Sequence, residues 1–175
     1  MKLSIVYYGD PILRKKTPLL EEVNDELALL AQNMVETMDA NNGIGLAAPQ
    51  IGKSLRMFVL RNYITREDGR IELTEPQVFI NPKITVLDDR VQEEDESCIS
   101  IPRLAGSVTR PYHIRVEAMG LDGQPFTEEV EGYKARVIMH ENDHLNGVLF
   151  IDRLSERERK KLEPHLKALK KKHGK

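Results

Sequence analysis

The segment from His140 to His144 contains the residue types and the spacing of a metal site. Two histidines four residues apart lie on one face of an α-helix, about one turn apart, so both imidazoles can reach a single ion. Glu141, beside the first histidine, is placed to take a proton from a water molecule activated by that ion. The alternative is a structural helix, in which two imidazoles and a carboxylate would be partly buried for no gain. The segment therefore predicts a catalytic metal site.

A catalytic divalent ion takes three protein ligands and leaves one position for water. The carboxylates that follow the motif lie in a charged stretch typical of exposed surface, so they are poor candidates for the third ligand. The only cysteine of the chain, Cys98, lies upstream. A lone cysteine is more often a small buried apolar residue, but its thiolate would complete the incomplete two-histidine site. We expect Cys98, His140 and His144 to bind the ion.

Three motifs, in this order, resemble those of the peptide deformylases. Residues 43–50 (GIGLAAPQ) match the first motif of that family in full. Residues 96–100 (ESCIS) resemble the second, with Ser97 in place of glycine and Ile99 in place of leucine. Residues 140–144 match the third, preceded by Met139 where the family usually has glutamine, and Arg103 is a further departure. With the opening GDPILR at residues 9–14, the resemblance covers about residues 7–154.

The resemblance implies a hydrolase that removes the N-formyl group from the formylmethionine of nascent polypeptides and releases formate. Glu141 would then be the base. The side-chain amide of Gln50 and the backbone N–H of Ile99 would donate hydrogen bonds to the oxygen that becomes negative, because a neutral amide adds no charge that would retain formate. The residues expected to line the substrate cleft are Gly43, Ile44, Gly45, Leu46 and Val137.

Polar residues near the ligands are expected to support them. Glu96 is expected to orient a ligating histidine by accepting its outer N–H, with Arg110 as a partner of Glu96 and with Asp143 in the same supporting layer. The other three histidines are expected to play no part in the site: His113 on a strand as a surface or packing residue, and His165 and His173 solvated in the C-terminal tail.

The identity of the metal depends on which argument is used. A Cys/His₂ set with an open position is typical of zinc, whereas the resemblance implies ferrous iron. We expect one Fe²⁺ ion, with Zn²⁺ or Ni²⁺ as substitutes in purified protein. Two other classes of function stay open. A zinc endopeptidase would need a third ligand downstream and would leave residues 43–50 unexplained. A non-catalytic binding module would have no use for Glu141.

Composition is typical of a soluble globular protein with a single domain, and the resemblance implies a catalytic domain at residues 1–154. The chain has 175 residues, of which 40% are hydrophobic and 31% charged. It has no apolar run of membrane-spanning length and no signal-peptide pattern at its start, so we do not expect it to bind a membrane. We do not expect it to bind DNA either. A single cysteine excludes an intramolecular disulfide, and a thiolate ligand needs a reducing compartment, which favours the cytoplasm.

Charge is concentrated in the C-terminal tail, residues 155–175. From residue 159 onward there are eight lysines and arginines and one acidic residue, a charge of +7. The net charge of −2 leaves −9 on residues 1–158, with 18 basic and 27 acidic residues. This asymmetry favours a tail that contacts a polyanion, which we expect to be ribosomal RNA near the nascent chain. The alternative is a solvated, partly frayed helix.

The periodicity of apolar residues predicts an α+β fold. The resemblance implies antiparallel β-sheets packed around a central helix that carries the HExxH motif, and the sequence also predicts a further helix at the C-terminus. Helices are expected from residues 24–25 to about 41–43, from 132 to about 146, and from Ser155 onward, where Pro164 should kink or interrupt the last one. Strands are expected at residues 55–60, 78–80, 84–87, 112–119 and 126–130. Gly43 and Gly45 are expected in a tight loop that no helix follows.

Overall fold

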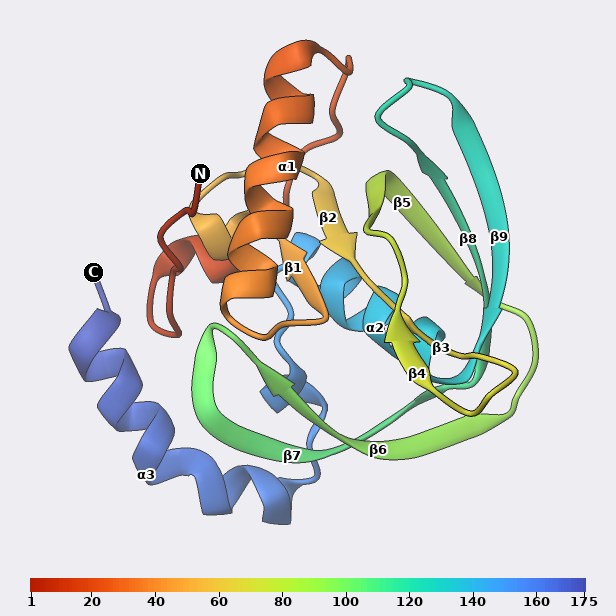
Figure 1. The fold of residues 1–175 in the computed structure, drawn as a ribbon. Helices are drawn as coiled ribbons and strands as arrows, with labels where there is room; N and C mark the ends of the chain where they lie inside the picture. Colours follow the sequence, from red (N-terminus) through yellow and green to blue (C-terminus); the bar gives the residue numbers. More distant parts are fainter.

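The computed structural model describes residues 1–175 and has the expected α+β architecture, with mostly antiparallel strands around a buried helix (Figure 1). The α-helices are α1 (Asp25–Ala40), α2 (Gly132–Leu145) and α3 (Glu156–His173). The strands are β1 (Gly45–Ala47), β2 (Met57–Leu60), β3 (Tyr63–Thr65), β4 (Ile71–Leu73), β5 (Gln77–Val86), β6 (Val91–Cys98), β7 (Ile101–Pro111), β8 (His113–Met119) and β9 (Pro125–Glu131). Short 3₁₀ helices are η1 (Pro11–Arg14), η2 (Ala48–Ile51) and η3 (Phe150–Arg153).

The main sheet is antiparallel, with strands in the order β1-β2-β5-β8-β9. Successive side chains of a strand point to opposite faces. In β2, Phe58 and Leu60 therefore pack in the cluster that contains the apolar residues of α2. Met57 and Val59 pack on the other face, with the buried residues of α1. The two helices thus cover opposite faces of the sheet, and α2, with ten buried residues, is enclosed in the interior.

A long hairpin of β6 and β7 forms a second sheet that lies beside α2 (Figure 1). Its register runs from Val91 opposite Pro111 to Ser97 opposite Ala105, and it shifts before Cys98, which pairs with Ile101. The hairpin packs on η3 and α3 through a third apolar cluster, which includes Val108, Phe150 and Leu166. These contacts hold Cys98, at the end of β6, next to the buried helix.

The C-terminal helix α3 is docked on the body. The Ser155 side chain caps its N-terminus by accepting the N–H of Glu158, at 3.2 Å. The helix continues through Pro164, which lacks the N–H for an i→i−4 bond, and Figure 1 shows it bending midway. Leu166 is buried in the third cluster. A solvated, frayed tail is therefore not what the structure shows for this segment.

Asp152, in η3, joins the N-terminal segment to α3. Its carboxylate accepts hydrogen bonds from Arg14, from the Leu149 N–H at 2.9 Å and from Arg159 at 3.3 Å. Burial raises the pKa of Asp152, but these donors outweigh burial and hold that pKa below its usual range. At the far end of α3, His173 stacks on Tyr7 with ring centroids 4.7 Å apart, so the expectation of a solvated His173 was wrong.

Most of the expected elements are present, with three corrections. The runs at residues 78–80 and 84–87 belong to one strand, β5, which is irregular between Ile80 and Lys83. Asn81, in this irregular stretch, has a φ of +52°. The strand is interrupted locally there, and this divides its apolar residues into two runs in the sequence. Gly45 lies in β1 rather than in a loop, and η2 follows it directly. The acidic run at residues 91–98, which has no apolar alternation, forms strand β6. No helix is long and apolar enough to cross a membrane.

Candidate active site

Helix α2 carries the polar residues of the site in the interior of the protein. It begins at Gly132, whose φ of +67° favours glycine, and it ends at Leu145, before Asn146. His140, Glu141 and His144 are all buried. The two imidazole rings lie 5.1 Å apart between centroids, edge to face, as the i, i+4 spacing predicts.

The end of β6 brings Cys98 to the two histidines. One ligand atom of Cys98, one of His140 and one of His144 lie within 4.8 Å of one another. Cys98 Sγ is 3.4 Å from His144 Nε2. With metal–nitrogen bonds of about 2.0–2.1 Å and a metal–sulfur bond of about 2.3 Å, two nitrogens and one sulfur on a tetrahedral ion would lie roughly 3.3–3.6 Å apart. The spacing of these three side chains fits one ion.

Glu96 lies at the centre of a buried network behind the ligands. Its carboxylate is 2.8 Å from His140 Nδ1 and accepts two hydrogen bonds from Arg110, at 2.6 and 2.9 Å. Arg136, one turn before His140 on α2, also donates to Glu96. Because His140 Nδ1 faces Glu96, its Nε2 is turned to the ligand cluster. Arg136 was missed in the sequence, although the i, i+4 spacing from His140 placed both on one helix face.

Asp143 extends this network to the C-terminal segment. It accepts a hydrogen bond from Arg110 at 3.0 Å and two from Arg153, at 2.6 and 2.8 Å. Arg110 therefore bridges the carboxylates of Glu96 and Asp143 and is itself buried. Guanidinium groups pair with both carboxylates, so neither buried negative charge is left without a positive partner.

Burial and hydrogen bonds shift the pKa values of His140, Glu141 and His144. Burial opposes the charged form of His140, but hydrogen bonds with Cys98 and Glu96 raise its pKa well above the usual value. Burial lowers the pKa of His144, which keeps its imidazole in the neutral form that binds metals. Burial raises the pKa of Glu141 to about 7, and the charge of His140 opposes that rise. Glu141 can therefore gain and lose a proton near neutral pH.

Gln50 and Ile99 line the same pocket. The Gln50 oxygen accepts the Ala47 N–H at 2.9 Å, so its NH₂ group points the other way, 3.4 Å from Cys98 Sγ and 3.1 Å from Ser100 Oγ. Gln50 is buried, not an exposed loop amide. Ile99 lies in the turn between β6 and β7, where its N–H donates to no backbone acceptor. Ser100 was not expected in the site, although it belongs to the motif at residues 96–100.

Glu141 lies directly against strand β1. A Cβ at Gly45 would meet Glu141 Oε1 at 2.5 Å and both Cγ and Cδ at 2.9 Å, so only glycine allows this approach. Oε2 of the same carboxylate is buried with no hydrogen-bond partner in the protein. A buried, unpartnered carboxylate oxygen is costly unless a ligand or a water satisfies it.

The outer edge of β1 is free, since β1 is the edge strand of the main sheet. Arg61 donates its N–H to the Ile44 carbonyl, and the register places Leu46 opposite Val59. Because bonded and non-bonded pairs alternate in an antiparallel ladder, Leu46 bonds to β2, and the N–H and C=O of Gly45 point outward. Leu46 is fully buried in the core and does not line the cleft, so its expected place there was wrong.

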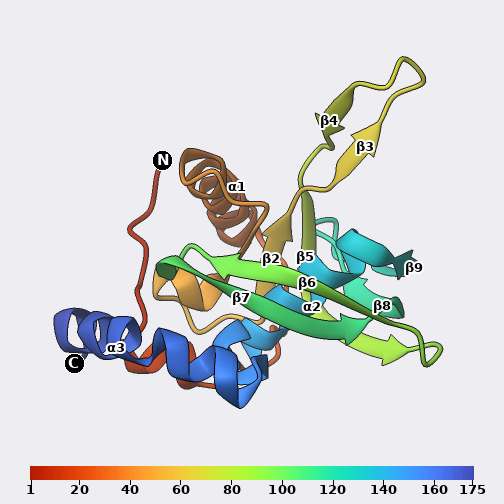
Figure 2. The same ribbon diagram turned by 90° about the horizontal axis from the view of Figure 1, so that it is seen from below.

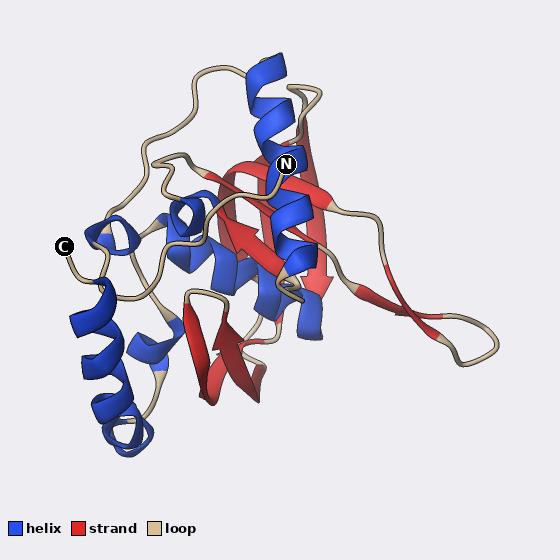
Figure 3. Cartoon of the chain, turned by 60° about the vertical axis from the view of Figure 1, so that its left-hand side comes forward, coloured by secondary structure: helices blue, strands red, loops and turns tan.

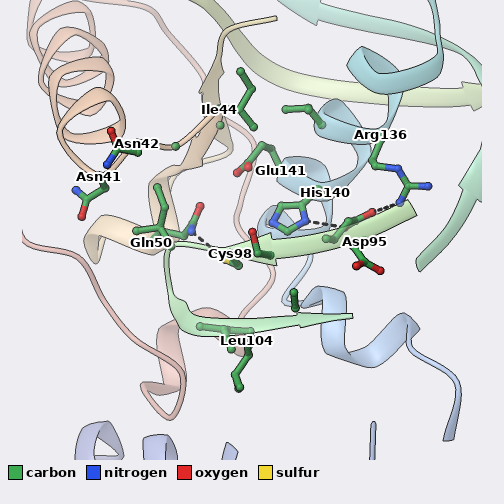
Figure 4. Close-up of a pocket in the computed structure, with 18 of the residues that line it drawn as sticks. Asn41, Asn42, Ile44, Gln50, Asp95, Cys98, Leu104, Arg136, His140 and Glu141 are labelled. Atoms are coloured by element: carbon green, nitrogen blue, oxygen red, sulfur yellow. Dashed lines mark hydrogen bonds and ion pairs between the residues drawn. The ribbon is translucent and has the colours of Figure 1, made fainter. Parts of the chain in front are cut away.

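These residues meet at a pocket of about 580 Å³. Figure 4 shows Gln50, Cys98, His140 and Glu141 converging on one point in it. Gly43, Ile44, Gly45 and Val137 also line it. Two tyrosines that the sequence analysis did not single out, Tyr63 and Tyr133, lie in its wall. Most of the expected residues thus gather at one cavity; those that do not line it are His144, Arg110, Asp143 and Leu46.

The departures from the family pattern are accommodated. Ser97 is not among the residues with positive φ, so its side chain causes no backbone strain. Met139 packs in the apolar cluster of α2 and the sheet. Arg103 has a φ of +65°, is exposed and lines the pocket. His113 lies away from the pocket, 2.9 Å from Asp88, as expected of a residue outside the site.

Fold and site together define a hydrolase of the HExxH metal class. Residues 2–160 match the family model described as polypeptide deformylase. The peptide deformylase of Acinetobacter baumannii is 42% identical over 160 residues, 91% of this chain and 87% of that protein. That of Agrobacterium fabrum is 44% identical over 151 residues, 86% of each chain. The crystal structure of the enzyme from Ehrlichia chaffeensis superimposes with a TM-score of 0.87 at 33% identity, over 98% of each chain. The chain belongs to the peptide deformylase family.

Proposed function

We propose that this protein removes the formyl group from the N-terminal formylmethionine of nascent polypeptides by hydrolysis, releasing formate. The observation that carries the proposal is the meeting of Cys98, His140 and His144 beside the buried carboxylate of Glu141, in a cavity bordered by a free strand edge. A peptidase of the HExxH type is not favoured, because the third ligand candidate lies upstream, in the motif that the deformylase family shares.

The donor set fits one divalent cation, held by the thiolate of Cys98 and by one nitrogen each of His140 and His144. When bound, such an ion supplies Lewis-acid activation of a water molecule and of the formyl oxygen. Glu96 keeps His140 in the required tautomer, and Arg110 and Arg136 hold Glu96 in place. The protein thereby fixes the ligands before any substrate arrives.

Glu141 is the proton carrier in this proposal. Its carboxylate accepts the proton of the attacking water and delivers it to the amine that leaves as the formyl C–N bond breaks. A pKa near 7 suits a group that must both accept and return a proton at neutral pH. The products are formate and a peptide with a free N-terminal methionine, so water is the only co-substrate.

Gln50 and Ile99 stabilise the developing negative charge. The Gln50 NH₂ group is aimed by the bond between its oxygen and the Ala47 N–H, and the N–H of Ile99 is free to donate. Losing one such donor typically costs about 10²–10³ in rate. The substrate backbone pairs with Gly45 on the free edge of β1, and the methionine side chain lies near Gly43, Ile44 and Val137.

The native ion in this proposal is Fe²⁺, with Zn²⁺ or Ni²⁺ as substitutes. We would prepare the protein anaerobically with each ion, measure metal content in the same samples, and follow formate release from formyl-Met-Ala-Ser. The iron form should be the most active and should lose activity in air, and acetyl-Met-Ala-Ser should not be cleaved. Formate release that persists after the metal has been removed and its absence verified would contradict the proposal.

We also propose that residues 1–154 form the catalytic domain and that the enzyme acts in the cytoplasm. The basic tail, residues 155–175, would then contact ribosomal RNA. Lys167, Lys170, Lys171 and Lys172 are exposed on α3 and pair with no acidic residue. Replacing these four lysines with glutamine keeps Leu166 in the core. The variant should keep its activity on a short peptide and lose salt-sensitive co-sedimentation with ribosomes. Equal co-sedimentation across a salt series would contradict an RNA contact.

A further inference from the structure

The β3–β4 hairpin is a part of the molecule that the proposed reaction does not use. It is a two-stranded antiparallel ribbon that pairs with no other strand. Figures 2 and 3 show it extending away from the body of the protein. Its base is held by reciprocal bonds between Asn62 and Thr74, and its tip carries the ion pair Arg70–Asp68. Two strands alone bury too little surface to be stable without other support.

One face of this hairpin is apolar and exposed. The register places Tyr63 opposite Leu73 and Thr65 opposite Ile71, so these four side chains share a face. Tyr63 is 51% exposed, Leu73 52% and Ile71 69%. Clustered exposed apolar side chains of this size commonly mark a binding surface. We call Tyr63, Leu73 and Ile71 the hairpin face.

The hairpin face is continuous with the catalytic pocket. Tyr63 lines that pocket, and its ring centroid lies 5.9 Å from that of Tyr133, at the start of α2. Tyr133 lines the pocket as well and is 47% exposed. An apolar strip therefore begins in the pocket wall and runs outward through Tyr63 and Leu73 to Ile71.

The direction in which a substrate would leave the pocket follows from the strand order. Glu141 lies against Gly45, so the formyl end of the substrate lies there. Toward Ala47 the edge of β1 is closed, because the Ala47 N–H is bonded to Gln50 and η2 follows. Toward Gly43 the edge is open. Strand β2 runs antiparallel to β1, so the chain after β2 lies beside Ile44, at Arg61, and then continues to Tyr63. The hairpin thus lies beyond the open end of β1.

We propose that the hairpin face binds apolar side chains of the nascent peptide downstream of the residues held in the pocket, at about positions four to seven. This inference rests on the proposed function, since it assumes that a formylated peptide lies along β1. An extended peptide advances about 3.3 Å per residue, so three residues cover the edge from Gly45 to Gly43 and the following ones reach Tyr63 and Leu73. The enzyme then favours nascent chains with apolar residues at those positions.

The test compares three substrates of the metal-loaded protein. They are formyl-Met-Ala-Ser and two octapeptides that begin with it, one with leucine and one with serine at the fifth and sixth positions. Half-burying two leucines should make kcat/KM about fivefold to thirtyfold higher for the leucine octapeptide, which corresponds to roughly 1–2 kcal/mol. The double variant Ile71→Thr/Leu73→Thr has β-branched residues, which favour a strand, at both positions, and it should remove this preference, with activity on the tripeptide unchanged.

Ile64→Thr is the matched control, because Ile64 lies on the opposite face of the same hairpin. It should retain the preference for the leucine octapeptide. Equal kcat/KM for both octapeptides in the wild-type protein would overturn the inference, and so would a preference that survives the double variant. If the hairpin face instead joined two copies of this chain, the wild-type protein would sediment as a dimer and the double variant as a monomer, with no octapeptide preference. Failure to cleave even the tripeptide would count against the proposed function itself.

Discussion

Replacing Gly45 with alanine tests whether the position of Glu141 determines the rate. The added Cβ would lie 2.5 Å from Glu141 Oε1 and 2.9 Å from its Cδ and Cγ, and all three distances are too short for real contacts. The carboxylate must therefore move by about 1 Å, because ordinary contacts to a Cβ are roughly 3.4–4 Å. Its surroundings are buried, so little free space receives it.

The expected cost can be derived from this displacement. A misplacement of about 1 Å at a catalytic group lowers the rate by roughly 10²-fold. Overpacking of a buried site also costs about 1–3 kcal/mol of stability. The metal ligands are not touched by the new Cβ. We therefore expect Gly45→Ala to bind the ion normally, to remain folded at 25 °C and to show kcat lowered about a hundredfold.

The matched control is Gly43→Ala. There the new Cβ would meet the end of a flexible side chain, Ile99 Cδ1 at 2.5 Å, with the next atom at 3.4 Å. That methyl group can rotate away without moving the Ile99 N–H, so kcat should fall only a few-fold. Steady-state kinetics and metal analysis of both variants provide the comparison. A fully metal-loaded Gly45→Ala protein with wild-type kcat would refute the proposed role of the Gly45–Glu141 contact.

Three further predictions concern the ligands, the buried network and acid stability. Cys98→Ser should abolish the sulfur-to-metal charge-transfer band of the cobalt-substituted protein and weaken metal binding; an unchanged spectrum would make Cys98 a packing residue. Glu96→Gln leaves Arg110 and Arg136 without their shared carboxylate, and should lower the free energy of unfolding in urea by about 3–5 kcal/mol; a loss below about 1 kcal/mol would contradict the argument. The pKa of Asp152 is lowered in the folded state, so its stabilising contribution is present above its unfolded pKa of about 3.9 and is lost as the pH falls through the folded value. Asp152→Asn should thus melt below the wild type at pH 7 and approach it at pH 3; a constant difference in Tm would show that titration of Asp152 is not involved.

The sequence predicted best those helices and strands whose own residues carry a recognisable pattern, such as a cap or a regular spacing of apolar residues. Helix α1 has its Asn24 cap and apolar residues at helical spacing, and α2 is bounded by Gly132 and Asn146. The hairpin of β8 and β9 follows from alternation on both sides of a Gly-rich turn. Strand β6 had no such signal, because its acidic side chains are mostly exposed and its pairing with β7 determines its conformation.

The site was partly predictable for the same reason. His140, Glu141 and His144 are neighbours in sequence, so helix geometry alone brings them together. The approach of Cys98 depends on the β6–β7 hairpin and on its packing against η3 and α3, which are tertiary contacts. The motif resemblance supplied what local reasoning could not. It did not extend to Arg136, which local helix geometry could have found, or to Tyr63 and Tyr133, whose meeting at the pocket depends on the packing of elements distant in the chain.

The most direct test of the central claim is to measure formate release by wild-type protein and by Glu141→Gln, both anaerobically loaded with Fe²⁺ and both assayed for bound metal. The proposed mechanism predicts equal metal content in the two proteins. Deformylation of formyl-Met-Ala-Ser should be lowered about 10³-fold or more in the variant, because Glu141 is the pocket carboxylate with a buried, unpartnered oxygen. Turnover near the wild-type value in a fully loaded Glu141→Gln sample would contradict it.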